Sequence, residues 1–425
     1  MEHEALITND AVVFGILMAI LGLVFYTSKS DHPFWRKFYG VVPALLLCYF
    51  LPSLLNTFGI VDPHTSRLYF VASRYLLPAA LVLLTISIDL KGIRQLGPKA
   101  VIMFLAGTLG IVLGGPIAIF LVSLVSPSTV AGDEVWRGLS TIAGSWIGGG
   151  ANQAAMKEVF EVGDIFSVMA TVDVIVANIW MAFLLFGAGR SKRVDKIFRA
   201  DASAIADVRR RIEDYRLSIA KMPTLTHVII ILGVGFAATG LAHLCADVLT
   251  PWLTDVAGRT NAAGEKPYSW LIDFSLTSPF FWIVVIATTL GLMLSFTSAK
   301  KLEGVGASRL GGVMIYILVA TIGLEMDITK IADNPGIFVV GLIWMLVHVS
   351  IMLFVAYLIK APFFFTAVGS QANVGGAASA PVVASAFHES LAPVGVLLAV
   401  LGYALGTYGA YMCGLLMQWV ASGIG

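Results

Sequence analysis

The sequence is poor in charge and in cysteine, and it lacks the short motifs of hydrolases and ATP-driven proteins. Asp, Glu, Lys and Arg make up 12% of its 425 residues, whereas soluble domains carry about 25%. The net charge of +1 excludes the basic footprint of a nucleic-acid-binding protein. The patterns HExxH, GxSxG and the P-loop are absent from the sequence. We therefore expect neither an enzyme nor an ATP-driven pump.

The three cysteines, Cys48, Cys245 and Cys413, are isolated, and each lies in or beside an apolar run. Such spacing indicates neither a disulfide framework nor a metal site. The first residues, MEHEALITND, are acidic and lack the basic region of a cleaved signal peptide. We expect the first apolar run to be retained as a membrane anchor.

Hydrophobic side chains are abundant and make up 58% of the sequence. A helix that crosses a bilayer needs about 17–25 consecutive apolar residues. Runs of this kind occur at 11–27, 39–58, 69–88, 98–125 and 163–187, and again at 225–249, 279–297, 310–326, 335–359 and 391–418. The sequence therefore predicts an all-α, polytopic protein that sits in the lipid bilayer of the cell (inner) membrane.

Each set of five runs has a glycine-rich segment between its fourth and fifth members, at 136–160 and 361–388. The shared order of elements indicates an internal repeat. Lys and Arg gather in the loops after the first and third runs, in the loop 188–222 and around Lys300, and the positive-inside rule places all of these loops in the cytoplasm. The second half then begins on the opposite side from the first, which makes the repeat inverted. We predict a first repeat at 1–187, a cytoplasmic amphipathic linker at 188–222 and a second repeat at 223–425.

Two models fit the glycine-rich segments. If 136–160 crosses the membrane fully, each half has six passes and the basic loop 188–222 falls outside. If it enters and returns as a re-entrant hairpin, each half has five spans plus one glycine-broken helix, and every basic loop is cytoplasmic. We favour two hairpins that enter from opposite faces, with both termini outside. A fully crossing discontinuous helix is the alternative.

The glycine-rich segments also carry side-chain amides and hydroxyls at matching places. Paired glycine-broken segments in two halves of a membrane protein are typical of a transporter's binding centre, because freed backbone groups need partners that lipid cannot supply. Amide and hydroxyl oxygens suit a sodium ion, and helix N-termini suit a carboxylate. The alternative is that glycine and serine only allow close helix packing. The candidate substrate- and ion-binding residues are Ser145, Gly148, Gly149, Gly150, Asn152 and Gln153 in the first segment and Ser370, Gln371, Asn373, Gly375, Gly376 and Ser379 in the second.

Asp173 lies inside an apolar run, where a carboxylate costs about 2.5–3.5 kcal/mol at the bilayer centre. We interpret it as a sodium ligand or a proton carrier, with Asn178 close enough to share the site. At the corresponding place in the second half the polar groups are Tyr403 and Thr407. A carboxylate that is only hydrogen-bonded to another helix is the alternative. The predicted sodium ligands are Asp173, Asn152 and Asn373, and no cofactor other than this coupling ion is expected.

The stretches Gly144–Gln153, Gln371–Pro381 and Leu397–Tyr408 together resemble a widespread bacterial and plant family of uncharacterised multi-spanning proteins of the YjcL type, a domain-of-unknown-function family. The layout is also similar to inverted-repeat secondary transporters, including sodium-coupled glutamate, citrate and bile-acid carriers. This similarity implies a sodium- or proton-coupled carrier, and it leaves the substrate open. One departure is the order of the amides, which follow the glycines in the first half and precede them in the second.

We therefore predict a sodium-coupled symporter of a small organic anion or amino-acid-like solute, with alternating access around two broken helices. Its expected partners are the solute, Na⁺ or H⁺, the lipid bilayer and, as an open option, a second copy in a homodimer, with no nucleic acid. Two other classes stay open. One is a sodium/proton antiporter or channel in which Asp173 titrates. The other is a non-transporting receptor or scaffold that acts through the basic segment 195–221.

Overall fold

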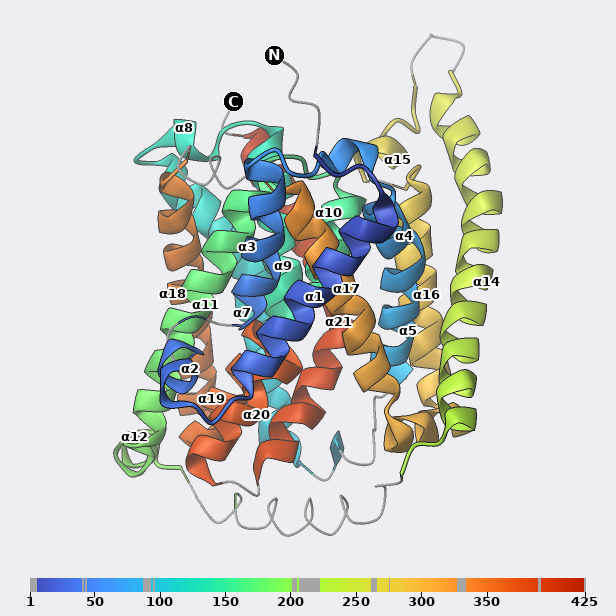
Figure 1. Ribbon diagram of the computed structural model, residues 1–425. Helices are drawn as coiled ribbons and strands as arrows, with labels where there is room; N and C mark the ends of the chain where they lie inside the picture. The colour runs from blue at the N-terminus through green and yellow to red at the C-terminus, as the bar shows by residue number, and fades with distance from the viewer. Residues whose placement is uncertain are drawn as a thin grey trace.

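The computed structural model describes residues 6–39, 42, 44–86, 93–94, 96–200, 205, 222–260, 266–274, 276–326, 334–388 and 391–423. Within these ranges every regular element is helical (Figure 1). The first half contains α1 (Asp10–Ser28), α2 (Pro33–Tyr39), α3 (Ala44–Thr57), η1 (Pro63–Thr65), α4 (Leu68–Val71), η2 (Ala72–Leu76), α5 (Leu77–Ile86), α7 (Pro98–Ser123), α8 (Pro127–Val130), α9 (Asp133–Gly148), α10 (Gly150–Val159), α11 (Phe166–Ala188) and α12 (Ser191–Phe198). The second half contains α14 (Leu225–Gly258), α15 (Trp270–Asp273), α16 (Pro279–Ser295), η3 (Ser298–Val305), α17 (Ala307–Glu325), α18 (Gly336–Ile359), α19 (Phe363–Val374), α20 (Gly376–Phe387) and α21 (Ala392–Ser422).

Eight of the described helices are long and apolar enough to cross a membrane. A ninth is added if α16 and η3, which are bent by 95° at their junction, count as one span. The predicted run 39–58 is represented by α3, whose 14 residues are too few for a full crossing; residues 40, 41 and 43 lie outside the described part. The prediction of an all-α, multi-pass membrane protein is confirmed.

The helices pack as two bundles, and each bundle draws on both halves of the sequence (Figure 1). The frame bundle contains α1, α3, α4, η2, α5, α14, α16, η3 and α17. The core bundle contains α7, α9, α10, α11, α18, α19, α20 and α21. The bundles meet where α10 and α21 pack against α5 and α16, and where α10 packs against α17.

The two ends of the molecule carry different elements (Figure 1). The start of α1 and the end of α21 lie at the upper end in this view, whereas α2, α12, α19 and α20 lie toward the lower end. Two contacts join segments near α19: Lys99 Nζ donates to the carbonyl of Lys360 at 2.9 Å, and the Phe363 N–H donates to Asp195 of α12 at 2.7 Å. Most of the predicted amphipathic linker, at 201–204 and 206–221, lies outside the described residues.

The helical run from α4 to α5 is widened by the π-helical turn η2. Pro78 has no backbone N–H, so the carbonyl of Arg74, four residues earlier, loses its helical partner. A ring nitrogen of His243 on α14 lies 2.8 Å from this carbonyl oxygen and takes that place. His243 of the frame bundle therefore supplies the hydrogen-bond partner that the Arg74 carbonyl lacks within its own helix.

Candidate functional site

Two helix pairs of the core bundle turn at glycine. Helix α9 ends at Gly148 and α10 begins at Gly150, and the intervening Gly149 has φ +81°. Helix α19 ends at Val374, and α20 begins at Gly376 with φ +56°. Both angles lie in the left-handed region that glycine adopts without strain. A Cβ added to Gly376 would lie 4.0 Å from the Cα of Gly149, so the α9–α10 junction and the α19–α20 junction meet.

The glycines of the α9–α10 junction serve two purposes. A Cβ on Gly144 would lie 2.5 Å from the carbonyl oxygen of Asn152, so α10 runs back along α9. A Cβ on Gly148 would overlap Asn152 Nδ2 and the carbonyl oxygen of Gly402 on α21. Gly149, in contrast, has open space where a side chain would begin. Close packing therefore accounts for Gly144 and Gly148, whereas the positive φ of the turn accounts for Gly149.

A cavity of about 410 Å³ lies where the two junctions meet α11, α17 and α21. This volume falls in the range of about 300–1,000 Å³ that small-molecule sites occupy. The predicted site residues that line the cavity are Ser145, Gly149, Gly150, Asp173, Asn178, Gln371, Gly375, Gly376, Ser379 and Tyr403. The structure thus brings together, around one space, residues that are far apart in the sequence.

Asp173 of α11 is 4% exposed and lies in the wall of this cavity. Trp146 Nε1 donates to its Oδ1 at 2.7 Å, and Gln153 Nε2 donates to its Oδ2 at 2.9 Å. The Tyr49 hydroxyl of α3 in turn donates to Gln153 Oε1 at 3.0 Å. None of the ion pairs among the described residues involves Asp173. The carboxylate is therefore positioned by neutral donors, with no side-chain cation of the described part to balance its charge.

Tyr49 was not predicted from the sequence. It lies in an ordinary apolar run, and it follows no glycine or amide cluster that would mark it. Only the packing of α3 beside α17 and the core bundle brings it to Gln153, 104 positions away. It links the frame bundle, through Gln153, to Asp173 in the cavity wall.

Asn152 and Thr407 lie beside the cavity rather than in its wall. Thr407 Oγ1 donates to Asn152 Oδ1 at 2.7 Å, and it lies 3.2 Å from Thr288 Oγ1. Asn152 is fully buried, and its Nδ2 has no partner within the described part of the chain. The pair ties α10 to α21, and Gly148 packs against the same amide. A role for Asn152 in binding sodium stays a prediction.

In the second junction Asn373 and Ser370 are likewise engaged within the protein. Asn373 Oδ1 accepts from Thr108 Oγ1 at 2.8 Å, and its Nδ2 donates to two backbone carbonyls at 2.9 Å each. Ser370 Oγ lies 2.8 Å from Trp180 Nε1 and 2.7 Å from His348 Nε2. These bonds hold α19 against α7, α11 and α18. The Asn373 oxygen would have to exchange the Thr108 hydroxyl to bind an ion, so its predicted sodium contact also stays a prediction.

Helix α17 contributes Ser308 and Arg309 to the cavity wall. The sequence predicts a span that begins at 310, after a basic cytoplasmic loop around Lys300. Helix α17 begins at Ala307, however, and its first turn carries Arg309 to the cavity. A basic residue at the boundary between a loop and a span is ordinary in membrane proteins, so the sequence did not mark Arg309 as a site residue.

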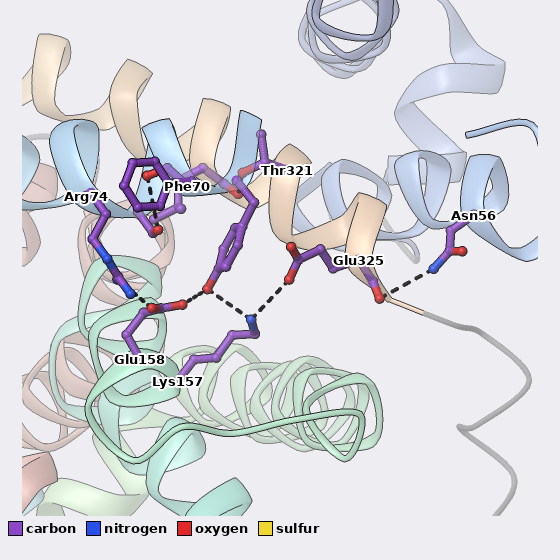
Figure 2. A network of polar contacts seen from close by, with 10 residues as sticks. Asn56, Phe70, Arg74, Lys157, Glu158, Thr321 and Glu325 are labelled. Atoms are coloured by element: carbon purple, nitrogen blue, oxygen red, sulfur yellow. Dashed lines mark hydrogen bonds and ion pairs between the residues drawn. The ribbon is translucent and has the colours of Figure 1, made fainter. Parts of the chain in front are cut away.

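A network of charged and polar side chains lies at the other end of α17 (Figure 2). Arg74 Nη1 lies 2.5 Å from Glu158 Oε2, and the Tyr69 hydroxyl contacts the other oxygen of Glu158. Lys157 Nζ donates to the Tyr69 hydroxyl at 2.9 Å and pairs with Glu325 at 3.4 Å. Lys157 and Glu158 belong to α10, whereas Tyr69, Arg74 and Glu325 belong to the frame bundle. The network therefore fastens the core bundle to the frame bundle.

A second cavity, of about 380 Å³, adjoins this network. Arg74, Lys157, Glu158 and Glu161 supply its charged lining. The Arg74 guanidinium also lies 4.3 Å from the centre of the Phe280 ring, which is a favourable position for a cation. Because Arg74 is engaged here, it does not reach the cavity beside Asp173.

We expect the Arg74–Glu158 pair to contribute measurably to stability. The Glu158 side chain is 11% exposed, so removing either partner leaves a charge with little compensation. A double-mutant cycle with Arg74→Gln and Glu158→Gln should give a coupling free energy of about 1–3 kcal/mol. The measurement is reversible unfolding in mixed micelles.

The exposed pair Arg259–Asp255, at 2.8 Å with side chains 61% and 67% exposed, provides the matched control. Its coupling free energy should be below about 0.5 kcal/mol, because solvent screens exposed pairs. Equal coupling free energies in the two cycles would contradict the view that the network stabilises the contact between the core and frame bundles.

The fold and the site define a multi-pass helical membrane protein with a largely apolar cavity, which carries a few polar groups, at the meeting point of two glycine junctions. Residues 15–420 match the family model "Protein of unknown function (DUF819)", and the chain belongs to that family. It is also similar to the "Uncharacterized membrane protein YjcL" of Bacillus subtilis (strain 168), with 27% identity over 357 residues, which cover 83% of this chain and 84% of that relative. The predicted family resemblance is confirmed.

Proposed function

We propose that this protein is a secondary transporter that couples sodium entry to the movement of a small organic anion or amino-acid-like solute. The observation that carries the proposal is the cavity where the two glycine junctions meet, with Asp173 in its wall. Interrupted helices that meet at a cavity between two halves of the chain are typical of secondary transporters. Close packing and the positive φ of the turn account for the glycines, but neither accounts for a cavity beside Asp173.

The proposed topology has two inverted repeats, with α9–α10 and α19–α20 as re-entrant hairpins that enter from opposite faces. The arrangement in Figure 1 supports it, because α10 lies toward the upper end and both α19 and α20 toward the lower end. Basic residues of α2, α12 and the α18–α19 connection, such as Lys37, Lys192 and Lys360, belong to segments at the lower end. By the positive-inside rule this end faces the cytoplasm.

Coupling follows from charge balance in the cavity. An anionic solute beside the Asp173 carboxylate would meet a like charge in a poorly solvated space, where repulsion is strong. A sodium ion at Asp173 removes this repulsion, with neutral oxygens such as those of Ser145 and Gln371 as further ligands in the same wall. The N-termini of α10 and α20, which no side chain caps, add a partial positive charge for the anion. Each ligand thus improves the binding of the other.

Alternating access would arise from movement of the core bundle relative to the frame bundle. The cavity reaches Arg309 near the start of α17, and the charged network holds α10 at the end of the same helix. Arg309 and Glu325 are separated by roughly 24 Å along the helix axis, at about 1.5 Å per residue. The structure would then correspond to a state with cytoplasmic access, and release of the network would accompany opening at the other end.

The proposal is tested with purified protein in proteoliposomes under an imposed inward sodium gradient. We expect accumulation of radiolabelled carboxylates or amino acids from a mixed pool, and collapse of this accumulation when the gradient is dissipated. Empty liposomes and liposomes with a potassium gradient are the controls. Absence of gradient-driven accumulation, together with absence of any sodium-dependent rise in melting temperature, would count decisively against sodium symport.

A second candidate is sodium/proton antiport, favoured by the lack of a counter-cation for Asp173 among the described residues. Antiport requires that sodium binding displace a proton from the carboxyl group. An unbuffered solution of the protein should then acidify on addition of sodium chloride. Symport of an anion with sodium predicts no such release.

A further inference from the structure

Arg309 differs from every other residue in the wall of the cavity beside Asp173. Among the described residues it is the only Lys or Arg in this lining, and it comes from the frame bundle, whereas Asp173, Asn178 and Gln371 come from the core bundle. The Arg309 side chain forms no ion pair or hydrogen bond with another residue of the described part of the chain. The neighbouring Glu303 is bonded to Ser308 instead, at 3.0 Å to its N–H and 2.7 Å to its hydroxyl.

A second, independent observation points to an occupant of the same cavity. Gln371 is 2% exposed, and its Nε2 donates to Ser379 Oγ at 2.7 Å. Its Oε1 is buried and has no partner within the described residues. An unpaired buried acceptor costs about 1–3 kcal/mol, so it indicates a missing donor or cation. Within the described residues, the α17 side of the cavity thus offers the Arg309 guanidinium without a partner, and the core-bundle side offers Gln371 Oε1 without one.

We propose that Arg309 recognises the carboxylate of the transported solute, which makes a small carboxylic acid the substrate class. This inference rests on the proposed function and narrows it. The guanidinium fork matches a carboxylate with two parallel hydrogen bonds. With sodium at Asp173 and the anion at Arg309, each charge in the cavity has a partner. Because Arg309 belongs to the frame bundle, it holds the anion only while the core bundle is in the position seen here.

The test compares wild type with Arg309→Gln, Arg309→Lys and the control Lys301→Gln in thermal unfolding at constant sodium and ionic strength. Lys301 is an exposed cation from the same region that does not line the cavity. The probes are acetate, succinate, citrate and L-glutamate, with the uncharged succinamide as the matched control for succinate. Arg309 is itself exposed, so the unliganded melting temperatures of the variants should match that of wild type.

We expect at least one carboxylate to raise the melting temperature of wild type and of Lys301→Gln, while succinamide does not. In Arg309→Gln the apparent affinity for that carboxylate should fall about 10- to 100-fold, the loss of one charge-assisted hydrogen-bonded contact. Arg309→Lys should recover part of it, because the charge remains and the fork is lost.

Three outcomes overturn the assignment: no carboxylate stabilises wild type, Arg309→Gln binds as well as wild type, or Lys301→Gln loses affinity to the same extent. These results are separable from the proposed function. Sodium-driven uptake of an uncharged solute would support the proposed transport function and refute a carboxylic acid as the substrate class. Carboxylate binding that depends on Arg309, without any flux, would support Arg309 as a binding residue and refute the proposed transport function.

Discussion

Replacing Asp173 with asparagine is expected to abolish sodium-driven uptake and the sodium-dependent rise in melting temperature. The substitution keeps the size of the side chain and removes its negative charge. It also turns one of the two acceptors into a donor that faces Trp146 Nε1 or Gln153 Nε2, which are 2.7 and 2.9 Å from the carboxylate. The site then has neither the charge for a cation nor a full set of acceptors. Sodium affinity should fall at least about 100-fold, because charged ligands dominate the binding of hard cations.

The control is Asp164→Asn, an exposed acid shortly before α11 that is not in the cavity wall. This variant should transport and respond to sodium as wild type does, which separates the local charge from the net charge of the protein. The decisive measurements are gradient-driven uptake and melting temperature as a function of sodium concentration. Normal sodium dependence of uptake and melting temperature in Asp173→Asn would show that Asp173 is not a sodium ligand and that its role is structural.

Replacing Gly148 with alanine is expected to destabilise the core bundle strongly. A Cβ at this position overlaps Asn152 Nδ2 and the backbone carbonyl of Gly402. The Asn152 side chain can rotate, but the Gly402 carbonyl belongs to the regular helix α21 and cannot yield without moving that helix. Overpacking of this kind costs about 1–3 kcal/mol. The melting temperature should therefore drop clearly, and the Thr407–Asn152 hydrogen bond should be lost with it.

The matched control is Gly240→Ala on α14, where an added Cβ meets nothing within 4 Å. Alanine is favoured over glycine inside a helix by roughly 0.5–1 kcal/mol, so this variant should equal or exceed wild type in stability. Thermal unfolding of both variants in the same detergent gives the comparison. Equal stability of Gly148→Ala and wild type would mean that α9 and α21 do not approach as closely as described.

Much of the candidate site could be predicted because the sequence signals it locally. Glycine, amide and hydroxyl residues inside apolar runs are conspicuous at Gly149–Gly150 and at Gln371, and Asp173 is conspicuous as an acid in an apolar stretch. These signals depend only on what lipid tolerates. The structure gathers Asp173, Gln371 and the two junctions at one cavity.

Other site features could not be predicted, because they depend on which helices become neighbours. Asn152 and Asn373 look equivalent to the cavity amides in the sequence, yet their oxygens are engaged by Thr407 and Thr108. Tyr49 and Arg309 carry no local signal of a site, and only the placement of α3 and α17 brings them to the cavity residues.

The sequence by itself determined the class of this protein, since its low charge and long apolar runs allow only a multi-pass helical membrane protein. It also marked Gly149–Gly150 and Gly375–Gly376, where α9 gives way to α10 and α19 to α20, by glycine clusters inside apolar stretches. The tertiary structure alone decided how the helices divide into frame and core bundles and which polar groups face the cavity. The physical reason is that lipid-facing and buried apolar residues are alike in composition, so the choice of neighbours is made by close packing of the kind seen at Gly144 and Gly148.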